Sequence, residues 1–569
     1  MNTLLDIWNR HTIKITAVLV IPLLLAFFVS KVQAEEIEEV IVVAQQVEVI
    51  TTNPLQNESL IEEIIPEFTW NAGGLGGFVG YNERGAQTVH TSVYRNGVPA
   101  NNPGSGWYDF GHDVVSGETV TVISGANGVM YGSGAVAGTV LIQDTIDSGV
   151  TARFGPATYR YYSVAPTDWF QVTDVNVNQP SVRSDNEETD PYSNTTAKAI
   201  IDVGDFVLKA VNTDYTYSYD NCYTASFSQT NDCTQEGNKQ TLSVSNEYFT
   251  IGRTTEQADY FTEDTLTYLN ESSRDYFRVG DTVDLSNLLQ VTYGADGNKE
   301  KYNEHKDDNY GVFLSINATF ALDYNFGIRA GNDDQNALRL GIAKDQFFFN
   351  VGTSYRKANL YEIYGDAYVD ANDNLMPEEG TGYELGFGAV SIFLYDFEES
   401  IEYQSGGMVT NIIEEAVYNT DGVLILDAVT EDVYTNASYY NSGSYVTKGV
   451  RFDNQWGPFG LLLKYNDSDQ PRIAEYIIVL DYMQTFKGVE LGATYKGLFD
   501  RTPGAYDLLP AGQEFLDDLK VLDLYAIKKF SNGWSLSGRI DNITDEEAEP
   551  VPGYGNDGRE IYITVNYNW

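Results

Sequence analysis

The last nine residues of the chain alternate between apolar and polar side chains without a break. One face of this segment consists of Ile561, Ile563, Val565, Tyr567 and Trp569. The other face consists of Tyr562, Thr564, Asn566 and Asn568. A β-strand that faces lipid on one side and a polar lumen on the other requires this period of two.

The same alternation recurs upstream over lengths that suit a membrane. Between residues 312 and 322 the apolar positions are Val312, Leu314, Ile316, Ala318, Phe320 and Leu322. The segment at residues 489–499 repeats the pattern. A run of about eleven residues is the length of a tilted transmembrane strand, whereas strands of a soluble β-sandwich rarely alternate for so long. Because every backbone group in a bilayer must be paired, we expect these strands to close into a barrel.

The predicted barrel covers residues 149–569, where alternating segments are separated by acidic, asparagine-rich loops. If a hairpin with its loops takes about 35–40 residues, about 22 antiparallel strands fit, and outer-membrane barrels usually have even strand numbers. A lumen of that size is wide enough to be plugged. The sequence after the N-terminal segment contains no apolar run long enough for a membrane-spanning helix.

Residues 67–148 differ from the barrel in composition, and we expect them to form the plug. They are rich in glycine, and Asn96-Gly97 predicts a hairpin turn. The segment at residues 120–142 places several glycines between two short apolar strands. Part of it fits a dinucleotide-binding pattern, but a β-branched run follows instead of a helix, which disfavours nucleotide binding. The expected fold is an all-β transmembrane barrel with a small α+β plug domain in its lumen.

The N-terminal segment predicts export. Arg10 and Lys14 precede an apolar run, and Val32-Gln33-Ala34 suits a cleavage site, so residues 1–34 are interpreted as a signal peptide. A transmembrane helix is the alternative, but the run is short and contains a proline. Residues 35–66 are polar and acidic, and they form either a flexible lead or the first strand of the following domain.

Charge and cysteine content narrow the choice of partner and compartment. The formal net charge is −48, which argues against a nucleic acid partner. Cys222 and Cys233 predict one disulfide in an oxidising compartment. The chain contains no nucleophile-elbow or zinc-protease motif, so we expect neither an enzyme nor a catalytic or metal centre. We expect no cofactor, although calcium bound by the acidic loops stays open.

Five motifs, one of which consists of two paired segments, follow one another along the chain. The first is EVIVVA at residues 39–44, and the next two are NERGAQTVHTSVYRNGVP and NGVMYGSGAVAGTVLI. YRKANLYEIYG and NLMPEEGTGYELG lie at residues 355–365 and 374–386, and GRIDNITDEE at 538–547 precedes the terminal Trp569. Together these segments resemble the TonB-dependent outer-membrane receptors. The resemblance covers residues 39–569 and implies a plugged barrel in the outer membrane of a Gram-negative bacterium.

The resemblance also implies partners. The first segment is similar to the TonB box, whose residues here are Glu39, Val40, Ile41, Val42, Val43 and Ala44. In the periplasm such a strand-like segment can add to the sheet edge of a partner. In the family that partner is TonB, energised by the ExbB–ExbD complex. Tyr567 and Trp569 are expected to be the C-terminal signal for the barrel-assembly machinery, and we expect a monomer embedded in outer-membrane lipid.

The plug residues singled out by the resemblance are Arg84, Gly85, Asn96, Gly97, Thr121, Ser124, Gly125, Tyr131, Gly132, Gly134 and Gly138. Two of them depart from the family pattern, because Thr121 and Ser124 stand where family plugs usually carry glutamate and arginine. Since one buried charge without its partner would be costly, the loss of both fits a paired interaction. We therefore expect this plug to be held by other contacts.

The expected function is TonB-driven import of a scarce bulky nutrient, an iron–siderophore or a cobalamin-like chelate. The candidate ligand contacts at the plug apices are Asn101, Asn102, Trp107 and Tyr108. Haem is disfavoured, because haem receptors of this family place a histidine between the mid-barrel segments and residues 359–373 contain none. The alternatives are a passive or uncoupled plugged β-barrel channel and a secreted soluble β-rich binding protein.

Overall fold

The structure is a computed structural model. It describes residues 47–51, 75–114, 116–181, 188–224, 226, 228–332, 335–414, 417–418, 424–426, 429–504, 507, 509, 512–546, 549 and 558–569. The predicted signal peptide and the predicted TonB box, residues 39–44, lie outside these residues. So does most of the predicted lead, of which residues 47–51 are described.

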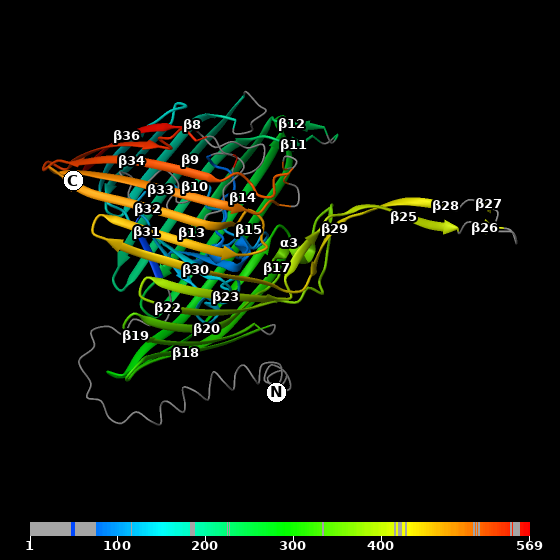
Figure 1. Ribbon diagram of the computed structural model, residues 1–569, viewed down its shortest axis with the longest axis horizontal. Coiled ribbons are helices and arrows are strands. Elements are labelled where there is room, and N and C mark those ends of the chain that lie inside the picture. Colours follow the sequence, from blue (N-terminus) through cyan, green and yellow to red (C-terminus); the bar gives the residue numbers. More distant parts are fainter. Residues whose placement is uncertain are drawn as a thin grey trace.

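The described residues confirm the predicted barrel. Twenty-two antiparallel strands form one closed sheet, and β36 (Glu560–Asn568) pairs with β6 (Gly149–Phe154) to complete the ring (Figure 1). The other strands are β7 (Arg160–Thr167), β8 (Phe170–Pro180), β9 (Thr189–Val203), β10 (Phe206–Tyr219), β13 (Cys233–Ser245), β14 (Phe249–Thr262), β15 (Thr265–Ser286), β16 (Leu289–Tyr302), β17 (His305–Thr319), β18 (Asp323–Gly331), β19 (Asn336–Lys344), β20 (Phe347–Arg356), β22 (Glu378–Phe387), β23 (Val390–Glu398), β30 (Tyr445–Trp456), β31 (Phe459–Asp467), β32 (Ala474–Phe486), β33 (Val489–Arg501), β34 (Leu519–Lys529) and β35 (Trp534–Asp541). Over the described part of the chain, no helix is both long and apolar enough to cross a membrane.

The two ends of the barrel differ in the length of their connections. At one end, here called the turn end, two to four residues join consecutive strands. At the other, the loop end, connections are as long as residues 357–377 and 399–444. Loop-end elements are β11 (Cys222–Tyr223), β12 (Gln229–Thr230), α3 (Leu360–Tyr364), β21 (Val369–Asp370), β24 (Ile401–Gln404), β25 (Gly407–Glu414), β26 (Val417–Tyr418), β27 (Leu424–Leu426), β28 (Val429–Thr435) and β29 (Ala437–Asn441). Figure 1 shows β25 and β28 as a hairpin that projects far from this end.

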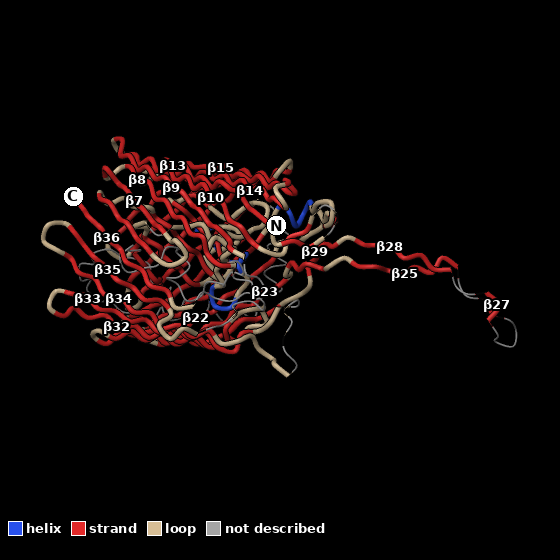
Figure 2. The backbone as a smooth tube through the Cα atoms, turned by 90° about the horizontal axis from the view of Figure 1, so that it is seen from above, coloured by secondary structure: helices blue, strands red, loops and turns tan. Residues whose placement is uncertain are grey.

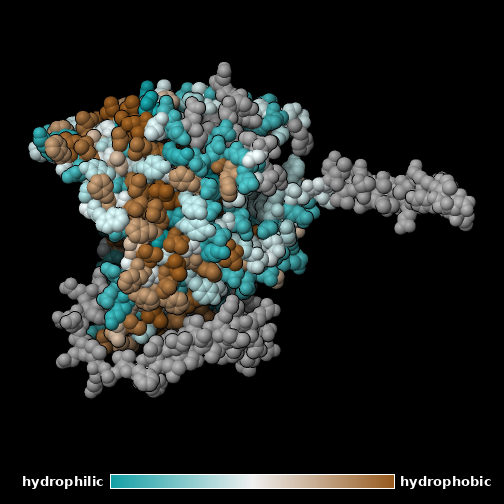
Figure 3. Space-filling model, viewed as in Figure 1, coloured by the Kyte–Doolittle hydropathy of each residue, from teal (hydrophilic) through white to brown (hydrophobic). Residues whose placement is uncertain are grey.

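Burial alternates along the strands as the sequence predicts. In β17, Val312 is 58% exposed and Phe313 is 5% exposed, and in β36 Ile563 is 52% exposed and Thr564 is 3% exposed. The apolar face therefore points outward, and Figure 3 shows apolar residues as a band across the barrel. β17 ends at Thr319, short of the predicted end, because the chain turns there toward β18.

Aromatic side chains gather on the outer face at the turn end. The exposed ones include Trp169, Phe206, Phe347, Phe387, Trp456, Phe486, Trp534 and Trp569. Such rings prefer the boundary between lipid and water. The centroids of the Tyr567 and Trp569 rings lie 5.9 Å apart in this group. Their role as an assembly signal stays a prediction.

The plug is a five-stranded sheet with the order β1-β4-β5-β2-β3. Its elements are β1 (Val47–Thr51), η2 (Glu83–Gly85), η3 (Thr88–His90), β2 (Thr91–Arg95), β3 (Val98–Pro99), β4 (Thr119–Ser124), α2 (Gly128–Tyr131) and β5 (Gly138–Gln143). β1 lies within the predicted lead and pairs with β4, which agrees with the alternative of a first strand. Asn96 and Gly97 join β2 to β3 with φ values of 52° and 81°, so the predicted hairpin turn is confirmed. In Figure 2 strands dominate the barrel wall.

The predicted disulfide is confirmed at the loop end. Cys222 and Cys233 are bonded, and their Cα atoms lie 6.0 Å apart. The bond closes the connection between β10 and β13, which also holds the short β11–β12 pair. In the loop-entropy view, closing a loop of this size stabilises the fold by about 3 kcal/mol.

A charge on the outer face should destabilise the barrel. Leu480 lies in the middle of β32 and is 47% exposed. We predict that Leu480→Lys lowers the free energy of unfolding in lipid vesicles by about 2–4 kcal/mol, because lysine is costly near the bilayer centre. Urea titration with tryptophan fluorescence measures this change. Ser405→Lys, at an exposed loop-end position, is the control, and equal effects of both substitutions would contradict a lipid-facing Leu480.

Candidate functional site

One set of buried contacts joins the plug to β22 and β23. It consists of Glu83, Arg84, Glu384 and Tyr395 and is here called the Arg84 group. In η2, Arg84 has a positive φ of 53°, and Gly85 follows with a φ of 77°. Arg84 Nη1 donates to Glu384 and to the Tyr395 hydroxyl (3.1 Å), and Arg84 Nε lies 3.2 Å from Glu83 Oε1. All four side chains are buried. The guanidinium charge is thus balanced by one carboxylate from the plug and one from the barrel.

Ser124, one of the two departures from the family pattern, is tied to this group. Its hydroxyl donates to Glu83 Oε1 (2.6 Å). A neutral donor therefore lies at this position, where the resemblance predicts an arginine. Thr121 lies in β4, where it pairs with Val49 of β1 and Leu141 of β5. The charge that meets the barrel near here is that of Arg84, not one from β4.

The predicted glycines lie where the plug chain turns sharply or approaches another element. Gly125, Gly132 and Gly134 have φ values of 101°, 68° and 84°. A Cβ on Gly138 would lie 3.0 Å from Cγ of Glu83, so a larger residue there would push Glu83 aside. These residues keep the segment between β4 and β5 compact enough for the plug to fit beside the barrel wall.

A second set of contacts, the His90 group, joins the plug to α3. His90 Nε2 lies 2.7 Å from Glu378 Oε2, and the Tyr445 hydroxyl lies 2.8 Å from His90 Nδ1. Arg356 contacts Glu378 and also Glu362 of α3 (2.9 Å). Glu362 closes the capping box that begins α3. A buried series of polar contacts therefore runs from the plug to the loop end.

A third set, the Glu118 group, joins the plug to β9. Lys198 of β9 contacts Glu118 and Asp144 (3.0 Å). Arg95 contacts Asp144 and Asp113, each at 2.8 Å. Burial by itself raises the pKa of Asp144, but the charges of Arg95 and Lys198 outweigh burial and hold the pKa well below its usual value. Asp144 therefore stays ionised, and the plug is held here by paired charges.

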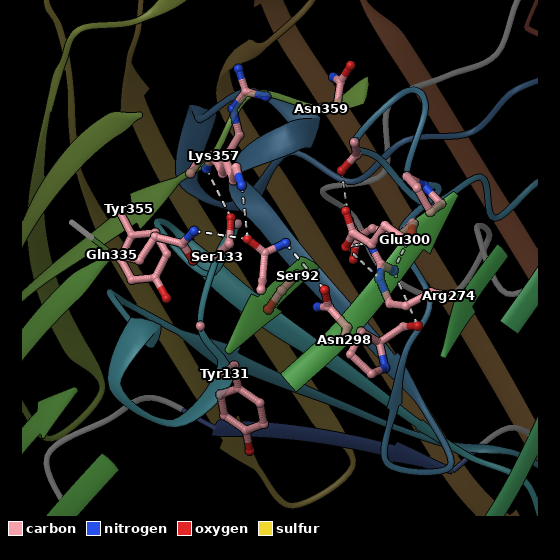
Figure 4. Close-up of a pocket in the computed structure, with 18 of the residues that line it drawn as sticks. Ser92, Tyr131, Ser133, Arg274, Asn298, Glu300, Gln335, Tyr355, Lys357 and Asn359 are labelled. Atoms are coloured by element: carbon pink, nitrogen blue, oxygen red, sulfur yellow. Dashed lines mark hydrogen bonds and ion pairs between the residues drawn. The ribbon is translucent and has the colours of Figure 1, made fainter. Parts of the chain in front are cut away.

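A polar cavity of about 100 Å³ lies between the plug and the wall formed by β15 to β20 (Figure 4). On the plug side it is lined by Ser92, Tyr131 and Ser133. On the barrel side it is lined by Arg274, Asn298, Glu300, Gln335, Tyr355 and Lys357. Ligand pockets usually measure about 300–1,000 Å³, so a bulky ligand would have to displace protein here.

α3 lies directly on the apex of the plug. The backbone amides of Leu360 and Tyr361 donate to the carbonyls of Pro103 and Gly104, at 3.0 and 3.2 Å. The Asn359 side chain donates to the next plug carbonyl (3.1 Å). These hydrogen bonds cover one side of the apex, so movement of α3 would widen the access to the cavity.

Phe78 and Trp107 form an exposed aromatic pair on the plug. Their side chains are 42% and 40% exposed, and their ring centroids lie 5.2 Å apart. Among the described plug residues they are the exposed large apolar side chains, and inside a closed barrel they cannot face lipid. The nearby Leu75 amide hydrogen-bonds to Gln179 at the loop end of β8, so the pair faces the loops. Apolar surface left in water is typical of a binding site.

The other three predicted ligand contacts have partners within the protein. The Asn101 side chain accepts from the Val93 amide (2.6 Å), and Asn102 Oδ1 accepts from a backbone amide of its own turn (2.7 Å). Tyr108 is 7% exposed and packs in the plug core. These side chains shape the turn that presents Trp107, and a direct contact between them and a ligand stays a prediction.

Several residues of these groups were not singled out by the sequence. Glu378 and Glu384 lie inside a segment that resembles the family, so that resemblance was a usable signal. His90 also lies inside such a segment, but its partner Glu378 is 288 residues further along the chain. Glu118 and Phe78 lie outside these segments, and only the closed barrel brings Glu118 to Lys198 of β9.

The acidic loops bring three carboxylates together. Ligand oxygens of Glu188, Asp190 and Asp220 all lie within 4.8 Å of one another at the loop end of β9 and β10. Oxygen ligands of this kind suit calcium. Calcium binding by the acidic loops stays a prediction.

Two family models match the chain in succession. The TonB-dependent Receptor Plug Domain matches residues 33–139, and the TonB dependent receptor-like, beta-barrel model matches residues 138–543. The chain belongs to the TonB-dependent receptor family. Members of this family are receptors and transporters of the Gram-negative outer membrane rather than enzymes. They work with TonB and bind bulky ligands such as siderophores.

Relatives of this TonB-dependent receptor differ in their ligands. The vitamin B12 transporter BtuB of Vibrio cholerae is 24% identical over 404 residues, which cover 62% of this chain and 60% of that protein. The ferric enterobactin receptor PfeA of Pseudomonas aeruginosa, in complex with enterobactin, matches with a TM-score of 0.65 and 13% identity over 92% of this chain and 100% of that chain. The siderophore receptor PirA of Acinetobacter baumannii has a TM-score of 0.64 and 13% identity, over 92% and 98%. At such identities the structural likeness shows the fold alone.

Substitution of Arg84 tests whether its ion pair with Glu384 holds the plug in the barrel. Arg84→Ala would leave Glu384 buried beside Glu83 without its ion-pair partner, at a cost of about 3–5 kcal/mol. We predict that this variant admits a large hydrophilic antibiotic that the unaltered receptor excludes. Growth inhibition measures the leak, and heat-modifiable migration on a gel checks that the barrel has folded.

The double variant Arg84→Ala with Glu384→Gln is the matched comparison. The double variant removes both charges of the pair, so less antibiotic should enter through it than through Arg84→Ala alone. A double variant that leaks more than the single one would contradict the pairing as the force that holds the plug.

Proposed function

We propose that this receptor imports a bulky metal chelate, an iron–siderophore or a corrinoid, by TonB-dependent transport. The observation that carries the proposal is the exposed Phe78–Trp107 pair on the loop side of a plug that fills a closed barrel. A ligand that covers these rings would bury apolar surface at the entrance to the lumen. Membership of the TonB-dependent receptor family supports transport as the activity, and the proposed ligand class follows the siderophore and vitamin B12 relatives described above.

Ligand capture, in this proposal, involves α3. The ligand enters from the loop end, rests on Phe78 and Trp107 and displaces α3 from the plug apex. Because Glu362 of α3 shares Arg356 with Glu378, displacement of α3 loosens the partner of His90. Binding of the ligand thereby weakens the contact between His90 and Glu378, which holds the plug.

Energy enters at the opposite end of the plug. The TonB box at residues 39–44 lies a few residues before β1, whose five residues pair with β4 at the edge of the plug sheet. TonB, energised by ExbB–ExbD from the periplasmic side, pulls the box and separates β1 from β4. The contacts that hold the plug to the wall include ion pairs and hydrogen bonds, which water can replace as the plug moves, beside apolar packing such as that of Val136 in the cluster with Phe393 and Phe397.

Two further functions stay open as alternatives. A passive or uncoupled channel would use the same barrel without the box, and a secreted soluble binding protein would not need the outward apolar band. Assembly of the proposed transporter requires outer-membrane lipid and the barrel-assembly machinery, with Tyr567 and Trp569 as the C-terminal signal. We propose that it acts as a monomer.

Removal of the TonB box should abolish uptake and leave binding intact. We predict that replacing residues 39–44 by a glycine–serine linker of equal length stops accumulation of the chelate that the receptor takes up. Radiolabelled cyano-corrinoid and ferric trihydroxamate are the probes, and their affinity for the purified receptor should change by less than about twofold. Uptake that persists in this variant would favour the passive channel.

Loss of the exposed indole ring of Trp107 should weaken binding of the chelate. We predict that Trp107→Ala raises the dissociation constant of the bound chelate about tenfold, which corresponds to about 1.4 kcal/mol. Calorimetry on the purified receptor measures the change. Trp169→Ala is the matched control, because Trp169 is 48% exposed at the turn end of the barrel. Equal effects of the two substitutions would contradict a ligand contact at Trp107.

A further inference from the structure

The cationic side chains that line the cavity are neutralised by carboxylates of the barrel. Arg274 is paired with Glu300, and Lys357 is paired with Asp307. Arg329 is likewise paired, and Arg356 belongs to the His90 group. The cavity that adjoins the plug apex is therefore polar, but its wall offers no cation that lacks a carboxylate partner among the described lining residues.

Two of these pairs are more exposed than the Arg329 and Arg356 pairs. Arg274 Nη2 lies 2.7 Å from Glu300 Oε1, and these side chains are 8% and 14% exposed. Lys357 Nζ lies 2.6 Å from Asp307 Oδ2, and these side chains are 18% and 25% exposed. In each pair both partners come from the barrel, so the pairing persists when the plug moves.

The connections above the cavity are strongly acidic. Residues 358–377 and 399–444, which form the two longest loop-end connections apart from Lys357, contain 12 aspartates and glutamates and no lysine or arginine. These connections add negative charge to the entrance, and α3 places part of it directly on the plug apex. An anionic ligand approaching the loop end would be repelled, whereas a neutral or cationic ligand would not.

We propose that this receptor takes chelates without net negative charge, and that Glu300 and Asp307 determine this specificity by neutralising Arg274 and Lys357. The inference rests on the proposed function and names its ligand class as neutral or cationic. A polyanionic chelate would have to replace an existing carboxylate at one of these cations, which leaves the displaced carboxylate unpaired in the lumen. A neutral chelate needs no such exchange and can use hydrogen bonds and the plug rings.

The test compares chelates of similar size and different charge. Calorimetry on the purified full-length receptor uses a neutral ferric trihydroxamate, a cationic ferric trihydroxamate, a neutral cyano-corrinoid and a ferric tris(catecholate) trianion. We expect the trianion to bind at least tenfold more weakly than the tightest of the other three. A trianion that binds as tightly as the best neutral or cationic probe would overturn the proposal.

Two variants test the assigned residues independently. Asp307→Asn removes the carboxylate partner of Lys357, and Glu300→Gln removes that of Arg274, so each should raise the affinity of the trianion relative to the neutral probe about tenfold. Asp275→Asn is the control, because Asp275 pairs with Arg253 (3.2 Å) where both side chains are more than half exposed. If the control raises this ratio as much as the two variants, or if neither variant raises it, the assignment of Glu300 and Asp307 is wrong.

Uptake distinguishes the inference from the proposed function. Preferential binding of the trianion with box-dependent uptake would refute the inference and leave the import function standing. Binding of a neutral or cationic probe, with no uptake or with uptake that does not need the box, would refute the function and leave the charge selectivity standing. Binding of none of the four probes would contradict both.

Discussion

The barrel depends on one constraint, that every backbone amide and carbonyl in the bilayer must find its partner in another strand. The pairing of β36 with β6, from Ile563 opposite Phe154 to Asn568 opposite Gly149, closes the sheet and leaves no free edge. Closure in turn creates an inside and an outside, and the alternation of each strand sorts its side chains between them. The lumen is therefore lined by polar side chains, and the plug has to be held against them.

Because the lumen is polar, the plug is held mainly by charges and hydrogen bonds. Arg84 and His90 of the plug each make a buried contact with a carboxylate of the barrel, and Lys198 of the barrel makes one with a carboxylate of the plug. Intact buried ion pairs add little to stability, yet a pair that loses one partner is costly. Such contacts specify one position for the plug and can still be exchanged for water when force is applied. This plug achieves it with a neutral Ser124 beside Glu83, where the family usually carries a charge.

The fold was predictable from local pattern, and the site was predictable only in part. Alternation in β36 and β17, the Asn96-Gly97 turn and the Cys222–Cys233 bond all follow from neighbouring residues, and the structure confirms them. Trp107 was singled out with the plug apex and is exposed there. Its neighbour Phe78 was not, because a phenylalanine in a glycine-rich segment gives no sign that its ring stays in water.

The sequence by itself determined that this chain makes a closed barrel with a glycine-rich plug and acidic loops. Those properties depend on periodicity, composition and short motifs, each of which is local. Only the tertiary structure decided which charges meet, such as Arg84 with Glu384 and Lys357 with Asp307, since the partners lie on elements far apart in the chain. Closure of the sheet fixes where Glu384 of β22 and Asp307 of β17 lie, and the position of the plug and of the connection after β20 brings Arg84 and Lys357 to them. The charge of the lumen wall, and with it the ligand class that we propose, is therefore a property of the closed barrel.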